Sequence, residues 1–211
     1  MRPTLLASAL VAVSTLAGAV GCGPQESPDA AYLRRIGDER VQKDEFFRSG
    51  SDSPVRPADR EIFLPLAYFD VDPDYAPPAR LALLDERTRL VMPTSTGKLR
   101  EMERVGVLEF TLKGAPQKLT AFVEAGAEVS RLFVPFSDLT SGTETYQAGR
   151  YMDIDPQSSG VYVVDFNLAY HPYCYYNADY DCPFPPAENR LKTPVRAGER
   201  LRAADTLAPT R

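Results

Sequence analysis

Residues 118–124 read KLTAFVE and carry the alternation of a β-strand. Successive side chains of a strand point to opposite faces. One face therefore carries Leu119, Ala121 and Val123, and the other carries Thr120 and Phe122. The turn Gly114-Ala115-Pro116 precedes this stretch. The pattern predicts a strand that enters the stretch from a tight turn.

The chain on both sides of this stretch repeats the pattern in short runs separated by Gly- and Pro-containing turns. No helical spacing interrupts the runs, which cover residues 80–92, 103–113, 131–136, 150–154 and 161–167. Short strands at turn-separated intervals are typical of antiparallel sandwiches and barrels. The sequence therefore predicts a mainly β fold, an antiparallel sandwich or small barrel with an N-terminal helix packed on it.

The expected N-terminal helix begins with Ser27 as its cap, Pro28 at the first helical position and Asp29 in the first turn. It is predicted to run to about Phe47, before a further brief helical turn near residues 57–63. Its stripe at helical spacing places two cations among apolar residues: Leu33, Ile36, Arg40, Lys43 and Phe47.

The two cations of this stripe allow two interpretations. The favoured one is that the stems of Arg40 and Lys43 cover the core while their charges stay in water. The alternative is that Arg40 reaches a carboxylate of the sheet and fixes the helix on it. Both interpretations place this face of the helix against the β domain.

Composition restricts the class of protein. The 211 residues are 44% hydrophobic and 25% charged, with a formal net charge of −5, which is ordinary for a globular protein. Basic residues are scattered and form no stripe along which phosphates would bind, so nucleic acid is not an expected partner. No cofactor is expected from any motif.

The N-terminus has the pattern of an export signal: Arg2, then an apolar stretch from Leu5, then Gly18-Ala19-Val20-Gly21-Cys22. A Cys directly after Ala-Val-Gly resembles the lipobox of bacterial lipoproteins, although Ala19 stands where Leu is usual. That resemblance implies acylation of Cys22 and a membrane anchor in the cell envelope, facing the periplasm or the exterior. An ordinary secretory signal is the alternative.

These signals divide the chain into four parts. We expect a signal peptide over 1–21, a tether over 22–30, a single β domain with its N-terminal helix over 31–202, and a frayed tail over 203–211.

Two weak motifs are excluded by their spacing. The acidic residues from Asp70 resemble the start of a calcium loop, but the required Gly and Glu positions hold Tyr75 and Leu81, so an Asx-rich turn is expected. Residues 94–98 resemble the end of a phosphate loop, but Met92 stands where the first Gly is required. We expect a hairpin turn there.

Residues 165–191 (DFNLAYHPYCYYNADYDCPFPPAENRL) contain too many prolines for a regular helix. We expect an ordered loop over the end of the sheet. Cys174 and Cys182 most simply form a disulfide in an oxidising envelope. The less favoured alternative is a metal site that also uses His171; no metal is predicted.

Residues 136–153 form a polar hairpin that includes Arg150, placed between Gly149 and large apolar residues. A buried guanidinium requires a carboxylate partner. Arg150 is therefore either half of a structural ion pair closing one end of the barrel or a ligand-binding arginine. The candidate ligand-binding residues, where this hairpin meets the 165–191 loop, are Arg150, Asp138, Tyr146, Tyr170, Glu188 and Asn189.

Several motifs of the mature chain resemble a bacterial lipoprotein family catalogued as domain of unknown function 1684. The resemblance is strongest in FSDLTSGTETYQAGRY (136–151) and in DFNLAYHPYCYY (165–176) with CPFPPAENRL (182–191). It also includes Arg40, Lys43, Phe46, Phe47, Ser53, Pro54, Phe63, Leu66, Tyr68, Phe69, Gly97 and Val195 to Glu199. In the family Asn often stands at the position of His171. No activity is established for the family, so the resemblance carries over no functional residue.

Three functions are consistent with these observations. The leading hypothesis is a lipid-anchored envelope module that binds a small anionic or glycan-like ligand or serves as an accessory protein. A second is an envelope hydrolase that pairs Asp138 or Glu144 with Glu188. A third is a purely structural envelope protein.

Overall fold

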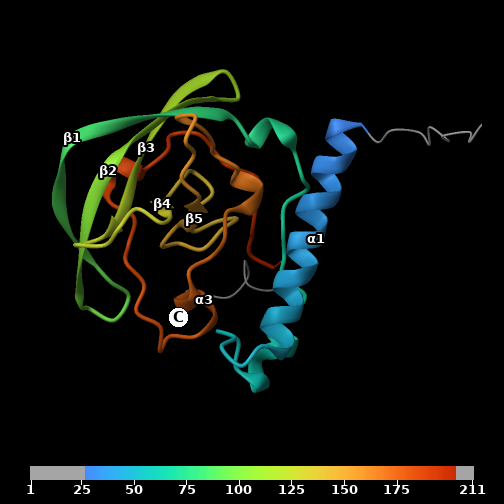
Figure 1. Ribbon diagram of the computed structural model, residues 1–211. Helices are drawn as coiled ribbons and strands as arrows, with labels where there is room; N and C mark the ends of the chain where they lie inside the picture. The colour runs from blue at the N-terminus through green and yellow to red at the C-terminus, as the bar shows by residue number, and fades with distance from the viewer. Residues whose placement is uncertain (1–26, 203–211) are drawn as a thin grey trace, which may run out of the picture.

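The computed structural model describes residues 27–202 (Figure 1). The predicted signal peptide, the predicted acylation site Cys22 and the predicted frayed tail lie outside these residues. The described helices are α1 (Pro28–Ser49), α2 (Arg60–Phe63) and α3 (Tyr173–Tyr176), and the short 3-10 turns are η1 (Pro57–Asp59), η2 (Pro73–Tyr75), η3 (Phe166–Leu168) and η4 (Ala187–Asn189). None of the described helices is long and apolar enough to cross a membrane.

The sheet contains six strands in the order β5-β4-β3-β2-β1-β6, and every pairing is antiparallel. Its strands are β1 (Pro78–Pro93), β2 (Leu99–Leu112), β3 (Ala115–Glu124), β4 (Leu132–Phe136), β5 (Arg150–Ile154) and β6 (Val161–Val163). The sheet curls into a half-barrel, and α1 stands beside it (Figure 1). The predicted fold class is confirmed.

The alternation in β3 separates two apolar clusters. Leu119, Ala121 and Val123 belong to the main core inside the curled sheet. Phe122 points to the other face and packs with Met92 and Met102. Both faces are buried because other segments cover the second face of the strand. The predicted alternation is therefore confirmed.

Helix α1 starts where the cap residues predicted: the Ser27 side chain accepts a hydrogen bond from Ala30 N. Of its residues, Ile36 and Phe47 are buried. Leu33, a member of the predicted stripe, is 44% exposed. With so little apolar burial, we infer that polar contacts contribute much of what holds α1 against the domain.

The turns behave as predicted. The Asp72 carboxylate accepts from Asp74 N in an Asx turn, and Lys113 bonds both carboxylates. Residues 94–98 join β1 to β2 as a hairpin turn, with Thr94 N donating to Lys98 O. Residues 165–191 contain only single turns of helix.

Candidate functional site

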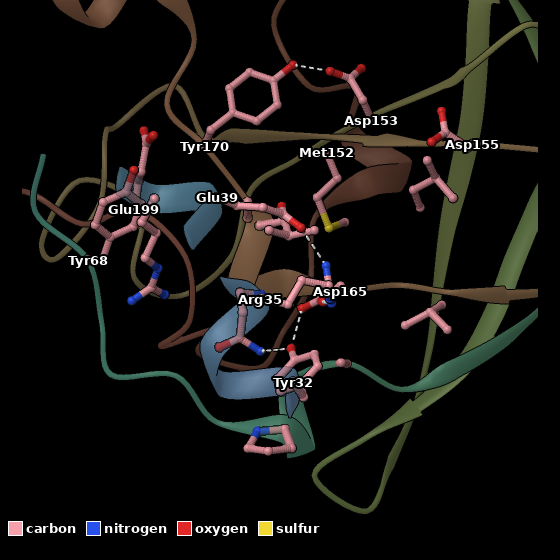
Figure 2. Close-up of a pocket in the computed structure, with 18 of the residues that line it drawn as sticks. Tyr32, Arg35, Glu39, Tyr68, Met152, Asp153, Asp155, Asp165, Tyr170 and Glu199 are labelled. Carbon is pink, nitrogen blue, oxygen red and sulfur yellow. Dashed lines mark hydrogen bonds and ion pairs between the residues drawn. The ribbon is translucent and has the colours of Figure 1, made fainter. Parts of the chain in front are cut away.

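A polar cleft of about 850 Å³ lies between α1 and the β5–β6 side of the half-barrel (Figure 2). Helix α1 lines one wall, and the 165–170 segment lines the other. The charged and hydroxyl-bearing residues that line it are Asp29, Tyr32, Arg35, Glu39, Arg40, Lys43, Tyr68, Asp153, Asp155, Asp165, Tyr170 and Glu199. We call this the polar cleft.

One end of the polar cleft is closed by a network around Asp165. The Tyr32 hydroxyl donates to Asp165 Oδ1 at 2.8 Å, and Arg35 Nη2 donates to Oδ2 at 3.1 Å. Asn167 donates to the Tyr32 oxygen at 2.9 Å. Burial and the neighbouring Asp165 raise the pKa of Tyr32 above its ordinary value. Tyr32 therefore remains a neutral donor, and Arg35 is occupied by Asp165 and Glu39.

The floor of the cleft carries a second ion pair. Lys43 Nζ lies 2.5 Å from Oε1 of Glu199, whose side chain is 1% exposed. The other oxygen, Oε2, accepts from His171 N at 2.6 Å and from the Tyr176 hydroxyl at 2.7 Å. Burial raises the pKa of Glu199, but Lys43 and these donors outweigh it, so the pKa lies below its ordinary value. Glu199 is therefore ionised and fully bonded.

Glu199 is held in place by the backbone around Gly198. Gly198 has a φ of +75°, and a Cβ there would lie 2.4 Å from Ala169 O, so the position requires glycine. Glu199 N donates to Ala169 O, and Phe69 N donates to Gly198 O. Gly198 and Glu199 are thus hydrogen-bonded to the backbone at Phe69 and at Ala169, and this places the Glu199 side chain against Lys43.

The ion pair between Lys43 and Glu199 shows that the favoured interpretation of the cations on α1 was wrong for Lys43. That interpretation left both charges in water, whereas Lys43 binds a buried carboxylate. The carboxylate belongs to the segment after Gly198 rather than to the sheet, and the residue that reaches it is Lys43 rather than Arg40. The physical reason is that a buried Glu199 needs a nearby cation.

Arg40 is the cleft cation that forms no ion pair among the described residues. Its Nη1 donates to Phe69 O at 3.0 Å, and its guanidinium lies 4.4 Å from the centre of the Tyr68 ring. Its Nε and Nη2 are shielded from solvent and have no hydrogen-bond partner in the described structure, and neither has the Tyr68 hydroxyl. Nε and Nη2 form the edge of a guanidinium that binds two oxygens of one carboxylate in parallel.

A second cleft, of about 920 Å³, lies on the other side of a partition formed by Lys43, Asp153 and Tyr170, which line both clefts. Lys43 Nζ lies 4.7 Å from the centre of the Tyr170 ring, and the Tyr170 hydroxyl donates to Asp153 at 2.7 Å, as Figure 2 shows. We call this second space the aromatic cleft. Its aromatic lining is Phe46, Phe47, Phe133, Tyr151, Tyr170, Tyr173 and Tyr180.

Arg150, the first of the ligand-binding residues predicted from the sequence, is 0% exposed. Its Nη2 donates to Asp138 Oδ2 at 3.0 Å and to Val195 O at 2.7 Å. Its Nη1 donates to the carbonyls of Ala197 and Glu199. This geometry is that of a structural ion pair, the alternative stated for Arg150, and it ties β5 to the C-terminal segment.

Asn189 and Glu188, also predicted for the site, hold strands together instead of lining either cleft. The Asn189 amide is buried, accepts from Thr120 N, and donates to Thr120 O and Pro135 O. It thereby bridges β3 and β4, which share only one register pair. Glu188 binds Arg104 of β2 at 2.8 Å.

The three carboxylates of the hydrolase hypothesis each bind a different arginine. Asp138 binds Arg150, Glu188 binds Arg104, and Glu144 binds Arg196. Each of the three carboxylates therefore serves an ion pair with its own arginine, and this arrangement gives the hydrolase hypothesis no support.

Tyr170 is the predicted site residue that the structure places in the clefts. Tyr146 lies apart from them and packs against the rings of His171 and Tyr175, at 6.3 and 5.3 Å between centroids. His171 is buried and accepts from Tyr146 N through Nε2. Burial lowers its pKa to about 3, so His171 is neutral, and its 3.8 Å approach to Glu199 is not an ion pair.

The predicted disulfide is absent from this structure, in which Cys174 and Cys182 are free thiols. Cys174 N donates to Cys182 Sγ at 3.2 Å, so the two residues are neighbours as expected. Within residues 27–202 no cluster of three or more His, Cys, Asp or Glu side chains has the geometry of a metal site.

The cleft residues that the sequence prediction missed come from one face of α1. Tyr32, Arg35, Glu39 and Lys43 recur at spacings of three and four residues and face the cleft with Arg40. A polar stripe at helical spacing beside apolar positions was the available signal. Nothing local marked Asp165 or Glu199 as its partners.

The family model described as Protein of unknown function (DUF1684) matches residues 61–200. The chain belongs to the DUF1684 family. The matched range includes Tyr68, Asp165 and Glu199, while α1 precedes it. No curated protein matches the chain.

This DUF1684 protein is also similar to a solved structure, the solution NMR structure of an uncharacterized protein from gene locus rrnAC0354 of Haloarcula marismortui. The two chains are 39% identical, with a TM-score of 0.65, over 81% of this chain and 95% of the other. The relative shares the fold and is itself an uncharacterized protein.

Proposed function

We propose that this DUF1684 protein is an exported, lipid-anchored binding module whose polar cleft takes a small ligand through an acidic group. The observation that carries the proposal is that Arg40 Nε and Nη2, which lie along one edge of the guanidinium, have no hydrogen-bond acceptor among the described residues. The nearby Tyr68 hydroxyl also has no partner. Buried polar groups almost always have partners. An unsatisfied buried donor costs about 1–3 kcal/mol, which a bound carboxylate or phosphate would relieve.

The other charges of the polar cleft support the choice of Arg40. Arg35 is paired with Glu39 and Asp165, and Lys43 is paired with Glu199. Arg40 is thus the lining cation with an unused edge among the described residues. Because Nε and Nη2 are shielded from solvent in this structure, ligand binding also requires the side chains over them to shift.

The binding test compares full-length wild-type protein with Arg40→Gln and Tyr68→Phe. The probes are sodium acetate, sodium glucuronate and inorganic phosphate, each matched to sodium chloride of equal ionic strength. We expect at least one acidic probe to raise the thermal midpoint of the wild type, and Arg40→Gln to abolish the rise. The carboxylate and phosphate arms identify the acidic group.

The matched control is Arg48→Gln on the same helix, where the arginine is exposed, pairs with Glu45 and lines neither cleft. It should respond to the probes as the wild type does. Equal responses of wild type and Arg40→Gln to all three probes, together with identical adducts in native mass spectra, would refute the site.

The lipid anchor places the site near a membrane. The tether from Cys22 to Pro28, at the rim of the polar cleft, spans six residues, a reach of about 20 Å when fully extended. We expect labelled fatty acid to be incorporated at Cys22, and Cys22→Ser to release the protein from membranes. Retention of label and membrane association by Cys22→Ser would contradict the anchor while leaving the cleft proposal intact.

A further inference from the structure

Cys174 and Cys182 are neighbouring free cysteines of the 165–191 loop. The two side chains are hydrogen-bonded to each other, and Cys174 N also donates to Cys182 Sγ at 3.2 Å. Cys174 is partly exposed, whereas Cys182 is buried. The two thiols are therefore close enough to react with each other, but only one of them is readily reached from solvent.

The surroundings distinguish the two thiols further. Cys182 is the main neighbour that acts on the sulfur of Cys174, and the Tyr146 hydroxyl acts on it in the same direction. These neighbours stabilise a thiolate, and they lower the pKa of Cys174 to about 7. The hydrogen bond to Cys174 and burial raise the pKa of Cys182. Near neutral pH, Cys174 is thus a partly ionised nucleophile beside a protonated neighbour.

We propose that Cys174 and Cys182 form a redox-active thiol pair, in which Cys174 attacks small disulfides and Cys182 resolves the product. This proposal does not depend on the polar cleft. It differs from a permanent structural disulfide because the reduced state is a folded, hydrogen-bonded arrangement with an asymmetric pair of thiols.

The reaction balances with a low-molecular-weight disulfide, RSSR, as the oxidant. The Cys174 thiolate forms a bond to one sulfur of RSSR and releases one RS⁻. The Cys182 thiol then loses its proton and attacks the Cys174 sulfur, which releases the second RS⁻. Two protein thiols lose two electrons to form one disulfide, and RSSR gains them to give two RSH with the two thiol protons.

Oxidation would act on the wall of the aromatic cleft. Cys182 lines that cleft, and its backbone is tied to the β1–β2 turn, where Ser95 N donates to Cys182 O and Cys182 N to Ser95 Oγ. Tyr173, next to Cys174, lines the same cleft and packs against Phe47 of α1. A disulfide would therefore restrain this wall relative to the reduced chain.

The test treats the full-length, reduced protein with oxidised glutathione, traps remaining thiols with iodoacetamide and digests with trypsin. Both cysteines fall in one tryptic peptide, residues 151–190, apart from the peptide containing Cys22. We expect the 151–190 peptide to become two hydrogens lighter and to regain its mass with dithiothreitol. Unmodified thiols after treatment, or a disulfide that resists dithiothreitol, would overturn the proposal.

Single variants test the roles of the two sulfurs. Cys182→Ser should accumulate a mixed disulfide with glutathione at Cys174. Cys174→Ser should react with oxidised glutathione at least about 10-fold more slowly, since the remaining thiol, Cys182, is buried. Equal rates for the two variants would contradict the assigned roles.

Wild-type protein supplies a measurement that does not depend on the folding of these variants. Iodoacetamide labelling at limiting reagent, read from fragment ions of the 151–190 peptide, should modify Cys174 before Cys182. The rate should rise through pH 7, and Tyr146→Phe should move that rise to higher pH. A rate profile centred at the ordinary thiol pKa would contradict activation of Cys174.

Discussion

Arg150 and Arg40 lie in opposite surroundings although both are shielded by the same small domain. Arg150 donates four hydrogen bonds, one to Asp138 and three to backbone carbonyls, and only its Nε has no partner. Arg40 makes one hydrogen bond, to Phe69 O, and leaves Nε and Nη2 unbonded. Each guanidinium also lies near an aromatic ring, Phe136 or Tyr68.

The difference follows from where each arginine is attached. Arg150 begins β5, at one end of the sheet, and meets the returning C-terminal segment, whose carbonyls converge on it. Arg40 stands on a helix that lines the cleft, and its Nε and Nη2 have no hydrogen-bond partner among the described residues. A satisfied buried arginine stabilises a fold, whereas an unsatisfied one beside a cleft indicates a binding site.

Replacing Arg150 with Met breaks the buried ion pair with Asp138 and should have the largest effect on stability. Arg150→Met leaves the Asp138 carboxylate buried without its cation, and we expect a loss of about 3–5 kcal/mol in the free energy of unfolding. Urea denaturation measures it. The double variant Arg150→Met/Asp138→Leu should recover part of the loss. If the stability of Arg150→Met lies within about 1 kcal/mol of wild type, the ion pair does not hold β5 to the C-terminal segment.

His171 is buried beside Glu199 and should make stability depend on pH. Burial is the main cause that lowers its pKa to about 3, with Arg150 and Lys43 acting in the same direction and Glu199 opposing them. The unfolded chain, with an ordinary pKa of 6.5, binds more protons between these values. Stability should therefore fall by up to about 1.4 kcal/mol per pH unit as the pH drops from 6.5.

The variant His171→Asn removes this titration. Urea denaturation at a series of pH values from 7 down to 4 should give a shallower decline for the variant than for the wild type. Glu199 contributes separately, because its pKa in the folded protein is lowered. The stability that it provides is lost only at lower pH, as the pH falls through that folded-state pKa. Parallel declines in the two proteins would place the acid sensitivity elsewhere.

Asn189→Leu tests whether one amide completes the junction between β3 and β4. The change leaves Thr120 N, Thr120 O and Pro135 O without their bonds. We expect a loss of about 2 kcal/mol, measured by urea denaturation. Gln147→Leu, at an exposed position, is the matched amide control and should change stability by less than about 0.5 kcal/mol. A similar small change in both variants would argue against this bridge.

Arg40→Met should have the smallest effect on stability and so sharpens the comparison with Arg150→Met. The variant removes one hydrogen bond but also two unsatisfied donors, so we expect stability within about 1 kcal/mol of wild type. The same variant should lose the stabilisation by acidic probes. A loss as large as that of Arg150→Met would show that Arg40 is structural, and Arg48→Met serves as the surface control.

The fold was more predictable than the site because its signals are local. Alternation in 118–124 and the Ser27 cap depend on neighbours a few residues away. Tyr170 was predicted and lines the clefts, whereas Arg150 and Asn189 were predicted and are buried in the framework. A buried arginine or amide looks the same in the sequence whether it stabilises the fold or binds a ligand. The sequence pattern therefore did not distinguish structural from ligand-binding residues.

The sequence by itself determined the strands, the turns and the start of α1, since hydrophobic period, Gly and Pro act through local sterics and side-chain direction. Only the tertiary structure decided which charges meet. Lys43 pairs with Glu199, 156 residues away, while Arg40 forms no ion pair with a carboxylate of residues 27–202. Such partnerships depend on how the curled sheet and the returning C-terminal segment are positioned, and no local pattern encodes that distance.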